Sequence, residues 1–273
     1  MSPASAPRPR DRRAPRTEMR ALLVALILVP AAATASGGYV RLPAGEIKSV
    51  IRYEDQKGPQ AVAAFEMMKQ PVTNAEFLAF VQGHPEWQRG RVPPVFAERN
   101  HYLSHWAGPL QPGAKALATQ PVTQVSWFAA SAFCEAQGAR LPTWAEWEYS
   151  SAADTTRRDA RADPQWRESI LGWYARPAST PMSPVGKSPA NVYGVQDLHG
   201  LIWEWTKDYA AMLVSGDSRT QSDPDLRRFC GAGALSMDDR ENYAVMMRVA
   251  MLSSLDAVNS TSSLGFRCAR DAH

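Results

Sequence analysis

Apolar residues recur at helical spacing in three segments of this chain, and a polar capping residue precedes each of them. Thr73 is followed three residues later by Glu76, and Thr143 by Glu146, which is the spacing of a capping box. Ser126 is a favourable N-cap in front of the remaining segment. The pattern predicts one helix that starts after Thr73, one over Trp127–Gln137 and one over Trp144–Ala153.

The rest of the chain predicts little regular structure. Residues 39–45 and 62–68 have the composition of short strands, whereas residues 83–120 are rich in Pro, Gly and aromatic residues and are expected to form loops. Charged residues dominate 154–167, and loops with short strands are expected beyond residue 172. The helices come early and do not alternate with strands, which predicts a single α+β domain.

The first 35 residues have the three-part pattern of a secretory signal peptide. A basic region ends at Arg20, an apolar run covers residues 21–29, and Ala33-Thr34-Ala35 supplies the small residues of a cleavage site. The apolar run is shorter than the roughly 20 residues that span a bilayer. We therefore expect a signal peptide over 1–35 and a periplasmic or secreted domain over 36–273; the alternative is an uncleaved N-terminal anchor.

The net charge of the chain comes from its N-terminus. The 273 residues contain 30 Lys and Arg against 27 Asp and Glu, a net charge of +3, and residues 1–35 alone hold six Arg and two acidic residues. The remainder is close to neutral and has no basic cluster, so a nucleic-acid partner is not expected. Three cysteines are too few for a disulfide-rich scaffold; they allow one bridge and one further thiol.

Five segments are distinctive when they are taken together: Lys69–Phe77, Pro121–Trp127, Arg140–Tyr149, Asp197–Thr206 and Gly265–Arg270. In this order they resemble the formylglycine-generating enzyme family, also called the sulfatase-modifying factor domain. The resemblance covers about residues 38–270. It implies a C-type-lectin-like α+β fold with low regular secondary structure.

Active members of that family oxidise a sulfatase cysteine to formylglycine with copper, which two cysteines five residues apart bind as soft thiolates. Counted back from Arg248, these two positions fall on Asp239 and Ala244, and no Cys lies between Cys230 and Cys268. The copper chemistry of the family therefore has no ligands here. The chain looks more like the members that lack the cysteine pair, among them accessory proteins of nitrite reductases.

The resemblance also implies a disulfide between Cys134 and Cys268. It would close a loop of over a hundred residues and stabilise the fold by on the order of 4 kcal/mol. The alternative is that both cysteines are buried thiols.

A calcium site is implied by the same resemblance. The side chains of Asp197 and Glu204 and the carbonyl groups of Gly200 and Ile202 are the matched ligands, and oxygen ligands suit a hard cation. The alternative is that both carboxylates pair with backbone amides or with Arg. A second calcium site of the family has no match in residues 171–182.

The candidates for a reactive site are Cys230, Asp239, Tyr243 and Trp203. Cys230 is either a copper or redox thiol with methionine neighbours or a small buried residue. The acidic segment 238–241 either binds a cation or a basic peptide or forms a solvated turn. Whether copper or iron is bound stays open.

Two histidines, His101 and His105, have the i, i+4 spacing of a helical metal pair. They lack the glutamate of a metalloprotease motif and lie in a segment rich in Pro and Gly. A structural loop is therefore the favoured interpretation over metal binding.

These features predict an exported accessory, maturation or binding protein on a formylglycine-generating-enzyme scaffold. It would serve a periplasmic protein partner, for which a copper redox enzyme such as nitrite reductase is the expectation from the resemblance. The alternative is an iron- or copper-dependent oxidoreductase with altered active-site chemistry. Formylglycine formation through Cys230 is a third and weaker hypothesis.

Overall fold

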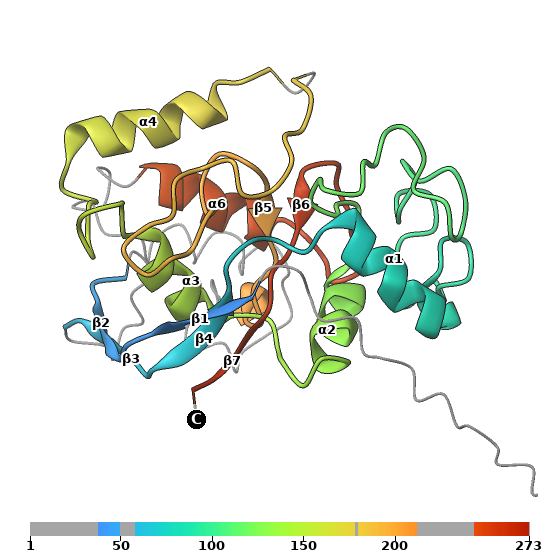
Figure 1. Ribbon diagram of the computed structural model, residues 1–273, viewed down its shortest axis with the longest axis horizontal. Helices are drawn as coiled ribbons and strands as arrows, with labels where there is room; N and C mark the ends of the chain where they lie inside the picture. Colours follow the sequence, from blue (N-terminus) through green and yellow to red (C-terminus); the bar gives the residue numbers. More distant parts are fainter. Residues whose placement is uncertain (1–37, 50–57, 178–179, 212–242, 273) are drawn as a thin grey trace, which may run out of the picture. The chain divides into compact units, whose positions relative to one another are not determined.

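The structure is a computed structural model that describes residues 38–49, 58–177, 180–211 and 243–272 (Figure 1). These residues belong to one unit of the chain, residues 33–273. Its helices and strands are short and are joined by long irregular segments, which confirms the expected mixed class with low regular secondary structure. In the ranges described, no helix is both long and apolar enough to cross a membrane.

A three-stranded antiparallel sheet joins the two ends of the domain. Its strand order is β1-β4-β7, so the C-terminal strand pairs with a strand from the start of the domain. Two smaller pairings accompany it, β2 with β3 antiparallel and β5 with β6 parallel. The strands are β1 (Tyr39–Leu42), β2 (Gly45–Ile47), β3 (Gln60–Val62), β4 (Phe65–Met68), β5 (Trp203–Glu204), β6 (Leu264–Gly265) and β7 (Ala269–Asp271).

The two strands expected near the start of the domain are each broken into two pieces. Residues 39–45 change direction at Pro43 and Ala44 between β1 and β2. Proline has no N–H to donate to a ladder, which accounts for the break. Residues 62–68 are interrupted at Ala63 and Ala64, so the β2–β3 pair turns away from the main sheet.

Three helices start where the capping residues predict. These are α1 (Asn74–Gly83), α2 (Trp127–Glu135) and α3 (Trp144–Ser151). Thr73 and Thr143 each accept a hydrogen bond from the N–H three residues later, and the glutamate there accepts one from the N–H of the capping threonine. Both capping boxes are therefore complete.

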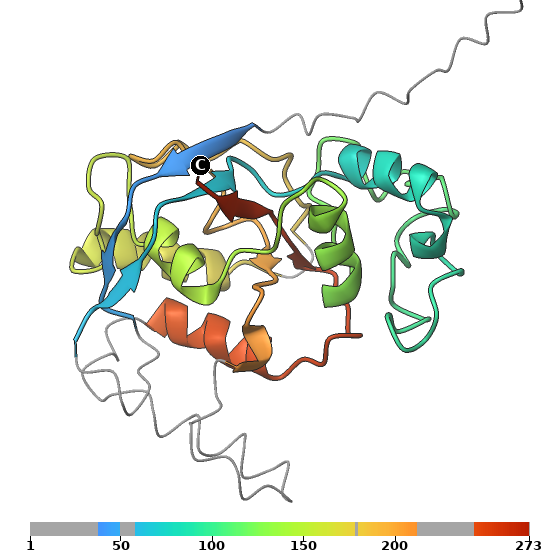
Figure 2. The same cartoon turned by 90° about the horizontal axis from the view of Figure 1, so that it is seen from below.

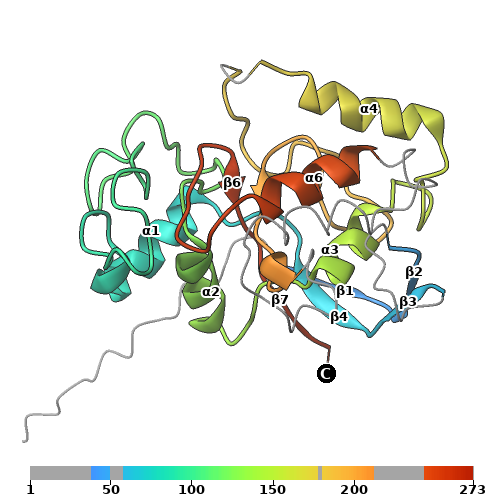
Figure 3. The same ribbon diagram turned by 180° about the vertical axis from the view of Figure 1, so that it is seen from behind.

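Two further helices, α4 (Pro164–Tyr174) and α6 (Tyr243–Ser253), lie where loops or surface segments were expected. Asp163 caps α4, with its side chain accepting from the N–H groups of Gln165 and Trp166, and proline occupies the first helical position. Figures 1 and 3 show α4 and α6 beside each other. Figure 2 shows α6 and the main sheet on opposite sides of α3. Two short 3₁₀ helices, η1 (Pro85–Trp87) and η2 (Tyr209–Ala211), complete the elements.

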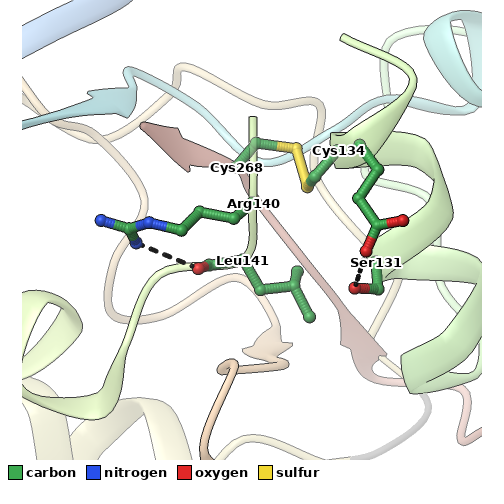
Figure 4. The surroundings of a disulfide bond; sticks show 6 residues. Ser131, Cys134, Arg140, Leu141 and Cys268 are labelled. Carbon is green, nitrogen blue, oxygen red and sulfur yellow. Dashed lines mark hydrogen bonds between the residues drawn. A yellow bond between two sulfur atoms is a disulfide. The ribbon is translucent and has the colours of Figure 1, made fainter. Parts of the chain in front are cut away.

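A buried aromatic cluster holds α1 and α2 against the C-terminal segment. Phe77, Phe133 and Phe266 are at most 1% exposed, and their ring centroids lie 5.3 to 6.1 Å apart. Directly beside it, a disulfide joins Cys134 near the end of α2 to Cys268 just before β7 (Figure 4). The structure thus contains the bridge that the resemblance implies.

Candidate functional site

Three aromatic side chains form one wall of a cavity of about 360 Å³, which we call the aromatic pocket. Trp173, Tyr174 and Trp203 lie with ring centroids 4.7 to 5.2 Å apart and with each pair of ring planes tilted by 49 to 56°. All three are half-buried. Aromatic surface of this kind binds apolar segments of a ligand or partner.

Elements from three parts of the chain position these rings. Trp173 and Tyr174 occupy the last turn of α4. Trp203 belongs to β5, where its N–H donates to the carbonyl of Ser263 at 2.8 Å. Gly200 allows the chain to enter this strand in a left-handed turn, with φ +89°, directly beside the Trp173 ring. The pocket therefore forms only when α4, the loop before β5 and the segment before β6 come together.

A buried ion pair lies on the core side of Trp203. Glu204 and Arg267 are both 0% exposed, and the guanidinium contacts both carboxylate oxygens, at 2.8 and 2.9 Å. Trp147 donates its indole N–H to the same carboxylate at 3.1 Å. Both carboxylate oxygens of Glu204 thus accept hydrogen bonds.

A second buried arginine adds positive charge beneath the pocket. Arg248 on α6 lies 3.5 Å from the ring centroid of Trp147 and donates to the backbone carbonyl of Glu204. Burial lowers the pKa of Arg248 to about 10, so it stays charged at neutral pH. Burial also raises the pKa of Tyr174 to about 12, against the opposing effect of Arg248, so the phenol stays protonated. Two buried cations therefore face one buried carboxylate.

His199, which precedes Gly200, is half-buried and contacts two indole rings. Its ring centroid lies 5.7 Å from that of Trp147 and 5.4 Å from that of Trp166. Burial lowers its pKa to about 4 despite a hydrogen bond between Nε2 and the carbonyl of Ser151. It is therefore a neutral packing residue at neutral pH.

The residues expected to bind calcium are held by hydrogen-bond donors. Asp197 accepts from the backbone N–H groups of Gly186 and Ser188 and from the Ser188 hydroxyl at 2.7 Å. Glu204 accepts from Arg267 and Trp147, as described above. This is the alternative in which both carboxylates pair with amides or Arg. Calcium binding stays a prediction, and donors around both carboxylates do not fit it.

The four candidates for a reactive site have different outcomes. Trp203 lies in the aromatic pocket. Tyr243 begins α6, but its side chain lies outside the described part of the structure, as do Cys230, Asp239 and the acidic segment 238–241. Trp203 is therefore the one candidate whose side chain the structure describes.

The two histidines at i, i+4 spacing do not meet. His101 is exposed and contacts Glu98 at 3.0 Å. His105 turns to Gln124, whose side-chain oxygen lies 2.6 Å from its Nδ1. Among the described residues no group of three or more His, Cys, Asp or Glu is arranged to hold a metal ion. Both histidines lie in a loop, as the favoured interpretation expected.

Sequence reasoning missed Trp173, Tyr174 and Arg248. The Asp163-Pro164 pair was a usable signal for a helix that ends at the two aromatic residues. No local signal marks Arg248, because its burial depends on α6 packing against Trp147.

A comparison with protein families matches residues 27–272 to the sulfatase-modifying factor enzyme 1-like domain. The chain belongs to this family. The formylglycine-generating enzyme of Streptomyces coelicolor is 30% identical in an alignment that covers 86% of this chain and 90% of that enzyme.

Two mouse relatives of this chain carry different names, one that of an active enzyme and one that of an inactive protein. The mouse formylglycine-generating enzyme is 31% identical over 62% of this chain and 49% of its own length, so the chain spans about half of that protein. The mouse protein named inactive C-alpha-formylglycine-generating enzyme 2 is 28% identical over 72% of this chain and 64% of its own length. Membership of the family therefore does not by itself establish activity.

This family member has too few cysteines outside its disulfide for a copper site with two thiolates. The whole sequence has three cysteines. The disulfide uses Cys134 and Cys268. Cys230 is then the one cysteine left, and a single thiol cannot form a site that needs two.

Proposed function

We propose that this chain is an exported accessory or binding protein of the sulfatase-modifying factor family, without the two-cysteine copper chemistry of formylglycine formation. The observation that carries the proposal is the Cys134–Cys268 disulfide, which leaves one of three cysteines outside the bridge. The scaffold is proposed to be C-type-lectin-like, and the location to be the periplasm or the extracellular space, because of the signal-peptide pattern in residues 1–35.

The aromatic pocket is the proposed binding surface. Trp173, Tyr174 and Trp203 present a large apolar surface that is partly accessible, which is the composition of a protein-binding hot spot. The proposed partner is a periplasmic copper redox enzyme such as nitrite reductase, and the support for it is the resemblance to family members that lack the cysteine pair. The alternative is that the chain itself is an iron- or copper-dependent oxidoreductase with altered active-site chemistry.

Replacing Trp203 by alanine should weaken partner binding by about thirtyfold or more, because hot-spot indoles contribute at least about 2 kcal/mol. Titration calorimetry of purified nitrite reductase, with and without copper, against the protein purified from the periplasm measures this. Phe96→Ala is the matched control, since Phe96 is 40% exposed and does not line the pocket.

Two results would contradict the proposal. The first is equal loss of affinity in Trp203→Ala and Phe96→Ala at unchanged thermal stability, which would remove the role of the pocket. The second is stoichiometric iron or copper in the purified protein by elemental analysis, together with oxidase activity, which would favour the enzyme alternative.

A further inference from the structure

A second cavity, of about 460 Å³, lies next to the aromatic pocket, and we call it the His105 pocket. Pro181, Met182 and Ser262 line both cavities. The His105 pocket has no part in the function proposed above. Its size is sufficient for a small ligand or one terminal residue of a peptide.

The hydrogen bonds of Gln124 determine which ring nitrogen of His105 carries the proton. The Gln124 side-chain oxygen accepts from the backbone N–H of His105 at 2.8 Å and from the Ser104 hydroxyl at 2.9 Å. A backbone N–H is always a donor, so the Gln124 atom is the oxygen and His105 Nδ1, at 2.6 Å, must donate to it as well.

The other ring nitrogen of His105 is therefore an acceptor. Burial lowers the pKa of His105, which favours the neutral ring. In a neutral imidazole with a proton on Nδ1, Nε2 carries a lone pair. None of the residues that the structure describes makes a hydrogen bond to His105 Nε2, and His105 lines the cavity.

Donor groups line the same cavity. Gln124 uses its oxygen for three bonds, which leaves its NH₂ group as a donor, and Lys115 is the one charged residue among those lining the cavity. Leu117 and Met182 are among the apolar residues of the same lining. An acceptor, a cation and an amide donor thus share one small volume.

The backbone around the pocket is held in an unfavourable conformation. Leu103 and Gln124 have φ values of +48° and +56°, a region that favours glycine. They are bonded to each other, since the N–H of Leu103 donates to the carbonyl of Gln124 at 2.8 Å. Such strain concentrates at binding and catalytic sites, where it positions side chains.

We propose that the His105 pocket binds the C-terminal residue of a peptide chain. The amide N–H of that residue donates to His105 Nε2, and its carboxylate accepts from the Gln124 NH₂ group and pairs with Lys115. The side chain of the terminal residue contacts Leu117 and Met182. This combination of one N–H donor beside one carboxylate is what distinguishes a chain terminus from an internal peptide segment.

Three small probes test the two parts of this recognition. N-acetylalanine has both the N–H and the carboxylate, N-acetylproline lacks the N–H, and N-acetylalanine amide lacks the carboxylate. We expect N-acetylalanine to bind and each of the other two to bind at least about tenfold more weakly, because unmatched polar groups in the pocket are penalised. A peptide that ends in alanine, compared with free N-acetylalanine, shows whether the source is a protein terminus or a small acid.

The measurement is NMR titration of the protein purified from the periplasm, observed at the side-chain nitrogens of His105. His105→Phe should abolish binding, whereas His101→Phe, on an exposed position four residues earlier, should leave it unchanged. Thermal unfolding establishes that both variants fold. Equal binding of all three probes, absence of N-acetylalanine binding, or a proton on Nε2 in place of Nδ1 would overturn the proposal.

Discussion

Glu204→Ala should lower the free energy of unfolding by about 3–5 kcal/mol, because removal of one partner leaves a charge buried without compensation. All five N–H groups of Arg267 are engaged: two contact Glu204, and three contact the carbonyls of Met68, Lys69 and Gln196. The cation therefore cannot turn toward solvent when the carboxylate is lost.

Urea unfolding measured on Glu204→Ala and on Glu66→Ala tests this prediction. Glu66 pairs with Arg270 at the surface, where the arginine side chain is 45% exposed. Its removal should change stability by no more than about 1 kcal/mol. A loss for Glu204→Ala as small as that for Glu66→Ala would contradict the account. So would a marked rise of the unfolding midpoint on addition of calcium that is present in the unmodified protein and absent in Glu204→Ala, since it would place a cation at this carboxylate.

Removal of the disulfide should have an effect of similar size. The double variant Cys134→Ala/Cys268→Ala should unfold with a free energy about 4 kcal/mol lower than the unmodified protein, since the bridge joins residues 134 positions apart. The two cysteines are fully buried beside Phe133 and Phe266, so the loss of packing adds to the loss of the cross-link.

Unfolding with and without a reducing agent provides the internal control for this variant. The unmodified protein should lose stability on reduction, whereas the double variant should not respond. An unmodified protein whose stability is insensitive to reductant, or that releases three thiols per chain when unfolded without reductant, would show that the bridge does not form.

Local signals predicted the helices that begin with a polar cap. Thr73, Ser126 and Thr143 each satisfy the first N–H groups of a helix within a few residues, so their effect is independent of the rest of the fold. α4 was missed because it buries only Ile170 along its length and so shows little apolar periodicity. Its cap, Asp163, was the signal that remained.

The candidate site was predictable only in part, because its decisive contacts join distant residues. The segment around Trp203 and Glu204 was found from the family resemblance. The partner of Glu204 is Arg267, 63 positions later, and the partner of His105 is Gln124 on another loop. The spacing of His101 and His105 gives no sign of the Gln124 contact, since spacing along the chain does not show which loops meet.

The most direct test of the account is formylglycine formation by the purified protein. A Cys-x-Pro-x-Arg peptide is incubated with Cu(I) and oxygen, and the aldehyde is detected by mass spectrometry, with the Streptomyces coelicolor enzyme under identical conditions as the positive control. The account predicts no aldehyde from this chain, because Cys230 is its one cysteine outside the disulfide. Aldehyde formation at a rate comparable to the control, lost in Cys230→Ser, would contradict it.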